Sequence, residues 1–273
     1  MPAATGFQVA ILVFAFQIVV LSAVRLAADG LSWPRESYAS LDQYITFGLA
    51  AVSLFAIAPI RRRCLGELGR RIPPGAGREI ALVALAAAAI PFALTGAVVL
   101  GAFAAGEPGS LPSRLPALDP AAEWARALSP AGAMKAVIIS AILAPLVEEL
   151  VFRGFLYRAW ERQWGWVPSA FLTSACFGMF HYYNFAGSFL ASVVLICVLR
   201  RTGTLRAPIL VHAAFNVLVS WPLLGQVLLG LDGREFSRIS AWSAELASLV
   251  FVAVALPAYL AMSRHDARDA VIR

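Results

Sequence analysis

Three short motifs inside apolar segments of the chain carry polar side chains suited to hydrolytic chemistry. They are EELVFR at residues 148–153, FGMFH at 177–181 and HAAFN at 212–216. An ionisable side chain in hydrocarbon costs at least about 2–3 kcal/mol, so a residue of this kind is a functional-site hypothesis. Two carboxylates, two imidazoles, a guanidinium and an amide together indicate a site that hydrolyses a bond within a membrane.

The first motif assigns different tasks to its two carboxylates. Successive residues of a helix point about 100° apart, so Glu148 and Glu149 face different directions. Arg153 follows Glu149 by four residues, the spacing at which helical side chains meet. We therefore expect a Glu149–Arg153 ion pair, with Glu148 facing a cavity as a general base. Pro145 is expected to kink this helix and open space for water. The alternative, a Glu–Arg clasp at a helix end, explains only one carboxylate.

The second motif predicts an imidazole held by an aromatic ring. Phe177 precedes His181 by four residues, so its ring is expected to stack on the imidazole and restrict its rotamer. Gly178 allows close approach of a neighbouring helix. These features favour a catalytic His181 over an isolated structural histidine.

The third motif places an imidazole and an amide on one helix face. His212 and Asn216 are four residues apart, and Pro208 lies near the start of their helix, where proline is favoured. Two hydrogen-bond donors aimed at one point suit an oxyanion, and one such donor contributes about 3 kcal/mol to transition-state stabilisation. The alternative is an interhelical hydrogen bond that holds two spans together.

Composition identifies the class of protein. The 273 residues are 60% hydrophobic and 14% charged, whereas about a quarter of the residues are charged in soluble domains. The net charge of +6 resides in connections between apolar spans, which indicates membrane orientation and argues against a nucleic-acid surface. Three cysteines without metal or redox spacing are interpreted as packing residues; they are Cys64, Cys176 and Cys197.

Hydropathy predicts an all-α, polytopic transmembrane bundle of about eight spans, forming a single integral-membrane domain over residues 1–273. The predicted spans are 7–28, 39–60, 79–105, 131–157, 167–182, 184–200, 207–229 and 241–262. The first is interpreted as a retained span. The proline-rich connection 106–130 is expected to lie outside the membrane, and residues 152–166 are expected to emerge along the interface.

Arginine distribution predicts the orientation of the spans. An expected loop between the second and third spans carries six arginines and should be cytoplasmic; they are Arg61, Arg62, Arg63, Arg70, Arg71 and Arg78. Alternation then places both termini in the cytoplasm, and a bacterial inner membrane is the expected location. At the helical rise, His181 lies about 22 Å and His212 about 9 Å from the cytoplasmic ends of their segments. How they reach a common depth is left open.

The order of these motifs resembles the family of type II CAAX prenyl endopeptidases and bacteriocin-processing proteases, known as the CPBP family. Residues 201–209, which lead into His212, resemble the region of that family's third motif. The resemblance covers residues 145–216 and implies an eight-helix intramembrane protease. It implies that Glu148 and His181 activate a water while His212 and Asn216 hold the oxyanion.

The resemblance further implies that Glu149 and Arg153 support the first motif. The expected substrate is a membrane-anchored or apolar peptide. No cofactor is expected, because the chain lacks a His-Glu-x-x-His motif. The alternative is one divalent metal such as zinc, held by Glu148, His181 and His212.

Two other classes of function remain as rivals of the protease. A non-catalytic membrane scaffold or immunity protein would keep the motifs for packing, with Glu148 and His212 hydrogen-bonded to neighbours. A transporter would use intramembrane carboxylates as proton or ion relays. It would also be expected to show internal repeats and paired broken helices, which the sequence lacks.

Overall fold

The computed structural model describes residues 58–106, 130–181, 184–220 and 243–269, together with short stretches between residues 20 and 32. These residues form helices and turns, and no strand occurs among them, as the all-α prediction requires. The chain divides into two compact units. The first contains residues 1–70 and 146–173, and the second contains residues 71–145 and 174–273.

Two helical stretches are long and apolar enough, by length and composition, to cross a membrane: Ala76–Ala104 and Phe185–Thr202. Shorter apolar helices span Trp166–Phe180, Arg206–Val219 and Ser248–Met262. The predicted spans 7–28 and 39–60, and the connection 106–130, lie for the most part outside the described residues. The number of eight spans therefore stays a prediction.

In the first unit, helix α3 (Ala58–Gly69) packs against the π-helical segment η3 (Leu150–Tyr157). The sequence predicted a loop here, and that prediction was wrong as far as Gly69. Arginine and leucine favour helix strongly, and the helix buries Cys64, whose Sγ lies 3.9 Å from the Leu150 carbonyl oxygen. Arg61 and Arg62 are exposed on this packed helix.

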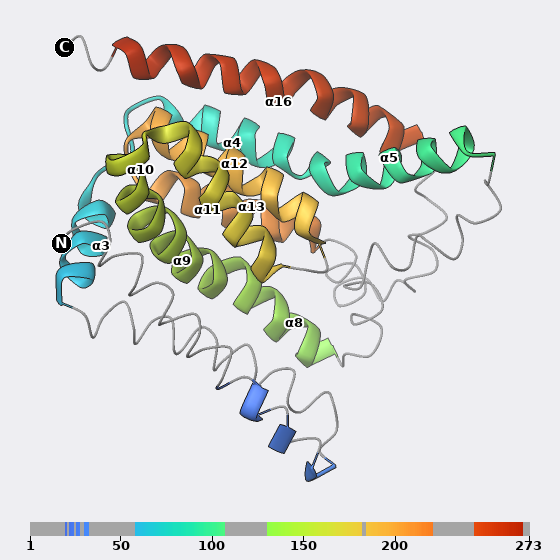
Figure 1. Ribbon diagram of the computed structural model, residues 1–273, viewed down its shortest axis with the longest axis horizontal. Coiled ribbons are helices and arrows are strands. Elements are labelled where there is room, and N and C mark those ends of the chain that lie inside the picture. Colours follow the sequence, from blue (N-terminus) through green and yellow to red (C-terminus); the bar gives the residue numbers. More distant parts are fainter. Residues whose placement is uncertain are drawn as a thin grey trace. The chain divides into compact units, whose positions relative to one another are not determined.

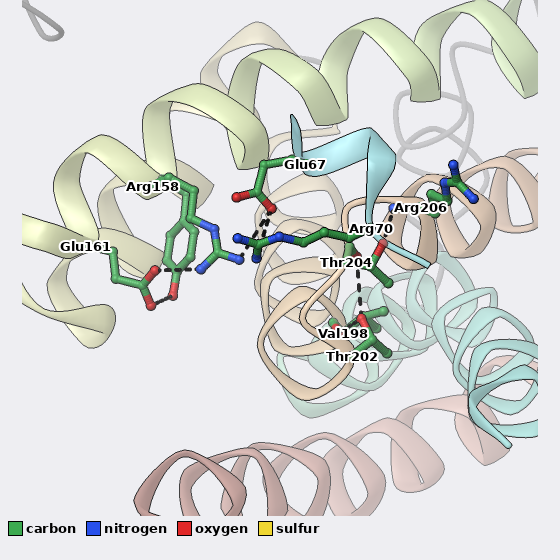
Figure 2. Close-up of polar contacts among 9 residues, drawn as sticks. Glu67, Arg70, Arg158, Glu161, Val198, Thr202, Thr204 and Arg206 are labelled. Carbon is green, nitrogen blue, oxygen red and sulfur yellow. Dashed lines mark hydrogen bonds and ion pairs between the residues drawn. The ribbon is translucent and has the colours of Figure 1, made fainter. Parts of the chain in front are cut away.

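Ion pairs connect α3 to helix α10 (Arg158–Trp164), which follows η3 directly (Figure 2). The Arg158 guanidinium lies 3.0 Å from Glu161 and 3.8 Å from Glu67. The Tyr157 hydroxyl donates to Glu161 at 2.6 Å. These contacts give protein partners to the Tyr157 hydroxyl and to the charged groups of Arg158 and Glu161, and Tyr157 and Trp160 are 0% and 4% exposed. The position of residues 152–166 along the membrane interface stays a prediction.

The second unit contains a core formed by α4 (Ala76–Ala87), α5 (Ala89–Ala104), α12 (Phe185–Thr202) and α13 (Arg206–Val219). The long helix α16 (Ser243–Asp269) runs beside α5 and also contacts α12 (Figure 1). Small and branched apolar side chains fill this core. They are Ile80, Val83, Ala84, Ala87, Ile90, Ala191, Val194, Leu195, Val198, Ala207 and Val211.

A polar cluster joins three helices of the second unit. The Arg201 guanidinium of α12 is ion-paired with the Glu79 carboxylate of α4. The Tyr259 hydroxyl of α16 donates to the same carboxylate at 3.1 Å, and the Arg201 guanidinium lies 5.6 Å from the Tyr259 ring centroid. These contacts hold α4, α12 and α16 in register around the core that carries α13.

The helical run that carries the first motif alternates between α-helical and π-helical hydrogen bonding and contains two π-helical segments. It proceeds through α8 (Pro130–Ile138), the π-helical segment η2 (Ile139–Leu143), α9 (Ala144–Glu149) and η3. The first π-helical segment ends just before Pro145, where the sequence predicted an irregular helix. Short π-helical segments inside α-helices occur frequently at functional sites.

Candidate active site

The first motif lies in the first unit and contains a buried ion pair. The Arg153 Nη1 donates to Glu149 Oε1 at 2.9 Å, and both side chains are fully buried. The pair predicted from the four-residue spacing is thus confirmed. Glu148 is half-buried and is carried on the last turn of α9, on a different face from Glu149. The two neighbouring carboxylates therefore occupy different environments.

The second motif ends helix α11 (Trp166–Phe180), and His181 is the first residue of the following turn. The rings of Phe177 and His181 are stacked, with centroids 4.5 Å apart and an interplanar angle of 28°. The predicted stack is confirmed. His181 Nδ1 lies 2.9 Å from the Phe177 carbonyl oxygen. Because a carbonyl only accepts, Nδ1 carries the proton, and Nε2 is the basic nitrogen of the neutral ring.

Phe177 also contacts the imidazole of the third motif. Its ring centroid lies 5.9 Å from that of His212, at an interplanar angle of 69°. Phe177 is 3% exposed, so it is a buried aromatic ring shared by both imidazoles. The two imidazoles, estimated from the sequence at different distances from the ends of their segments, thus both contact the same phenylalanine within the second unit.

Helix α13 presents His212 and Asn216 one turn apart. His212 is buried, and Asn216 is half-buried. The Asn216 Nδ2 donates to the backbone carbonyl oxygen of Ser140, in η2, at 2.7 Å. This contact is the interhelical hydrogen bond that the sequence offered as an alternative role for Asn216. The amide nitrogen carries two protons, so one hydrogen bond leaves a second N–H on the same atom.

A buried turn between α12 and α13 sets where the third motif begins (Figure 2). Gly203 adopts φ 68° at the end of α12, a left-handed conformation that glycine adopts without steric cost. The Thr202 hydroxyl donates to the Val198 carbonyl at 2.7 Å. The Thr204 hydroxyl accepts from the backbone N–H of Arg206 at 3.3 Å, at the start of α13. Thr204 is fully buried, so this turn fixes the start of α13, six residues before His212.

The second unit thus brings together Phe177, His181 and His212, and places Asn216 one turn further along the helix of His212. Glu148, Glu149 and Arg153 belong to the first unit, and the convergence of Glu148 with the imidazoles stays a prediction. Sequence reasoning missed Ser140, which occurs in no motif. The available signal was Pro145. Proline has no backbone N–H, so it cannot donate a hydrogen bond to the carbonyl of Ser140, five residues earlier.

A metal site would need more than these two imidazoles. The bond from His181 Nδ1 to a carbonyl is typical of metal-ligating histidines, because it leaves Nε2 for the metal. Within the described residues, however, no group of three or more His, Cys, Asp and Glu side chains is gathered to hold an ion. The zinc alternative with Glu148, His181 and His212 as ligands stays a prediction.

Comparison with known proteins gives one match. Residues 130–218 match the family model described as type II CAAX prenyl endopeptidase Rce1-like. No curated protein and no solved structure matches the chain. The matched region contains all three motifs, the π-helical segments and the turn before α13. Residues 130–218 are therefore similar to the Rce1-like family of type II CAAX prenyl endopeptidases, which agrees with the resemblance that the order of the motifs indicated.

Proposed function

We propose that the chain is an intramembrane endopeptidase that hydrolyses a peptide bond of a membrane-associated substrate. The observation that carries the proposal is the contact of both motif imidazoles with Phe177, inside a region that matches a protease family. His181, in the turn after α11, and His212, in α13, thus share one buried ring in an apolar part of the chain. A hydrolytic site requires such a cluster of polar groups.

In the proposed reaction, Glu148 and His181 activate the attacking water. The carboxylate of Glu148 accepts one proton of the water, and the basic Nε2 of His181 accepts a hydrogen bond from the other. The resulting hydroxide attacks the scissile carbonyl carbon and forms a tetrahedral intermediate. When the intermediate collapses, the C–N bond breaks and the proton held by Glu148 passes to the leaving amine.

His212 and Asn216 are proposed to stabilise the oxyanion of that intermediate. A ring N–H of His212 and the second N–H of the Asn216 amide would donate to the negative oxygen. Donors placed before the reaction contribute most where water is scarce, because the local dielectric is low. The partial burial of Asn216 and the burial of His212 support this role.

The substrate is proposed to be a peptide with a prenylated C-terminal CAAX sequence or a similarly apolar anchor. The apolar helices that carry the motifs support this class, since a substrate held by the membrane can reach a site at membrane depth. A glutamate-activated water requires no metal. We propose this mechanism over the zinc-dependent one, in which the metal would supply Lewis-acid activation of the water.

Cleavage of a farnesylated CAAX peptide by the purified full-length chain in lipid vesicles tests the proposal. We expect wild-type protein to release the C-terminal tripeptide. Glu148→Ala should lose at least about 100-fold in kcat while its melting temperature stays that of wild type. Full activity of Glu148→Ala would reject Glu148 as the base.

Chelation separates the two mechanisms. Incubation with EDTA or 1,10-phenanthroline, followed by removal of the chelator, should leave the cleavage rate unchanged within about twofold if no metal takes part. Loss of activity that added zinc restores would instead support the three-ligand site. Zinc content of the purified protein, measured by mass spectrometry, provides a readout independent of the substrate.

The scaffold alternative has one observation in its favour, which is the Asn216–Ser140 hydrogen bond. A protein that keeps the motif only for packing would cleave no peptide. Its Asn216→Ala variant would lose stability in proportion to the lost hydrogen bond. The cleavage assay therefore separates the two functions.

A further inference from the structure

The hydrogen bond between Asn216 and Ser140 depends on an unusual backbone carbonyl. In an α-helix, the carbonyl of Ser140 would accept from the N–H of residue 144. Here the N–H of Ala144 donates to the Ile139 carbonyl, five residues back, because η2 is π-helical. In the same register, the Ser140 carbonyl would accept from residue 145, which is proline and has no N–H.

The Ser140 carbonyl is therefore left without a helical donor by the π-helical register and Pro145 acting together. A carbonyl that is shielded from water and has no donor is costly, so such groups are almost always paired, and the contact of Ser140 with Asn216 is partly buried. The Asn216 Nδ2 supplies the donor at 2.7 Å. Since a carbonyl can only accept, the contact fixes which end of the amide faces η2.

We propose that Pro145 is a positioning residue for Asn216. By withholding an N–H, it keeps the Ser140 carbonyl available to hold one proton of the amide, so that the other is directed away from η2. This inference rests on the proposed function for its catalytic consequence, because the oriented second N–H is the proposed oxyanion donor. The hydrogen-bond competition itself is independent of that function.

The test is a double-mutant cycle of Pro145→Ala and Asn216→Ala, read by the melting temperature of the full chain in detergent. In Asn216→Ala, the Ser140 carbonyl loses its donor, and the backbone N–H that Pro145→Ala introduces can replace it. When Asn216 is present, the same N–H competes with its amide. We compare the shift in melting temperature that Pro145→Ala causes in the Asn216→Ala background with the shift that it causes in wild type. The shift in the Asn216→Ala background should lie about 2–4 °C higher.

Pro257→Ala is the matched control, because Pro257 also lies inside a helix of the second unit, in α16. Its effect on the melting temperature should be the same in the wild-type and Asn216→Ala backgrounds. Equal effects of Pro145→Ala in the two backgrounds would overturn the proposal. If Pro145→Ala does not yield folded protein, Asn216→Asp removes both N–H groups at constant size. A wild-type melting temperature for that variant would also overturn it.

The catalytic consequence is read from kcat and KM on the farnesylated CAAX peptide. Pro145→Ala should lower kcat about tenfold with KM unchanged, and should change kcat less than about twofold when Asn216 is already replaced by alanine. Equal losses in both backgrounds would show a structural effect and overturn the positioning role. If wild-type protein cleaves no such peptide, the proposed function fails while the melting-temperature cycle still decides the link between Pro145 and Asn216.

Discussion

At the scale of single residues, the two neighbouring glutamates differ most clearly in their surroundings. Glu149 is fully buried against Arg153, whereas Glu148 is half-buried on another face of the helix. Removing one partner of a buried ion pair leaves an uncompensated charge, which is costly. Substitution of Glu149 should therefore lower the stability of the protein, whereas substitution of Glu148 should lower its activity.

Glu149→Gln should lower the free energy of unfolding by about 3–5 kcal/mol, because the buried Arg153 charge loses its counter-charge. Denaturant unfolding of the purified protein measures this loss. Glu67→Gln is the control, since Glu67 forms longer ion pairs that are less buried, and it should cost less than about 1 kcal/mol. Equal effects of the two substitutions would contradict a special role of the buried pair.

Phe177 provides a second prediction at this scale. Phe177→Leu keeps an apolar side chain and should cost less than about 1.5 kcal/mol in stability. It should lower kcat about tenfold, because both imidazoles lose the ring that restricts them. Phe180→Leu, at a residue of the same helix that is 40% exposed, should leave kcat unchanged. An equal kcat for the two variants would show that the shared ring does not position the imidazoles.

The residue contacts that sequence predicted are those set by one helix. Glu149–Arg153 and Phe177–His181 are both separated by four residues, and helical geometry alone brings such pairs together. The partner of Asn216 lies 76 residues away, and its carbonyl is available only because of a local change in hydrogen-bond register. No periodicity of side chains encodes that change. Pro145 alone, in a regular α-helix, would have indicated the carbonyl of residue 141 instead of Ser140.

At the scale of elements, α11 and α13 are shorter than a full membrane span. The 15 residues of α11 rise about 22 Å, less than the roughly 30 Å of a hydrocarbon core. Within the turn after α11, the N–H of His181 donates to the Gly178 carbonyl, and the N–H of Asn184 donates to the His181 carbonyl. Backbone groups paired in this way can be accommodated at membrane depth.

Gly178 allows this turn to form closely against α12. A Cβ at Gly178 would lie 2.9 Å from the Phe185 ring and 3.0 Å from its backbone carbonyl oxygen. Gly178→Ala should therefore destabilise the protein by about 1–3 kcal/mol through overpacking, as measured by thermal unfolding. In the control Gly101→Ala, nothing lies within 4 Å of the new methyl group, and stability should rise by about 0.5–1 kcal/mol. A neutral Gly178→Ala would contradict the close approach.

Element limits were predictable where apolar runs are bounded by polar residues. The spans predicted at 167–182 and 184–200 correspond to α11 and α12, with limits at Trp166–Phe180 and Phe185–Thr202. Helix α3 was missed because its arginines are typical of a connecting loop. The burial of Cys64 that stabilises this helix depends on tertiary packing, which the sequence pattern does not show. The burial of Tyr157 and Trp160 likewise depends on partners distant in sequence.

At the scale of the whole molecule, the arginine distribution predicts that residues 61–78 face the cytoplasm. In a variant lacking the three native cysteines, Arg62→Cys should react with a membrane-impermeant maleimide in inverted vesicles and not in intact spheroplasts. Arg62 is exposed on α3, so labelling reports its side of the membrane. Gly109→Cys, in the connection expected on the opposite side, should show the reverse pattern. Labelling of both cysteines from one side would contradict the predicted orientation.

The central claim is that the carboxylate of the first motif and the imidazole of the second act on one water. Its most direct test is the kcat of Glu148→Gln, His181→Ala and the double variant on a farnesylated CAAX peptide. Each single change should lower kcat by at least about 100-fold, and the double variant should be no slower than the slower single variant. A Glu148→Gln protein that cleaves at the wild-type rate, or losses that multiply in the double variant, would contradict the account.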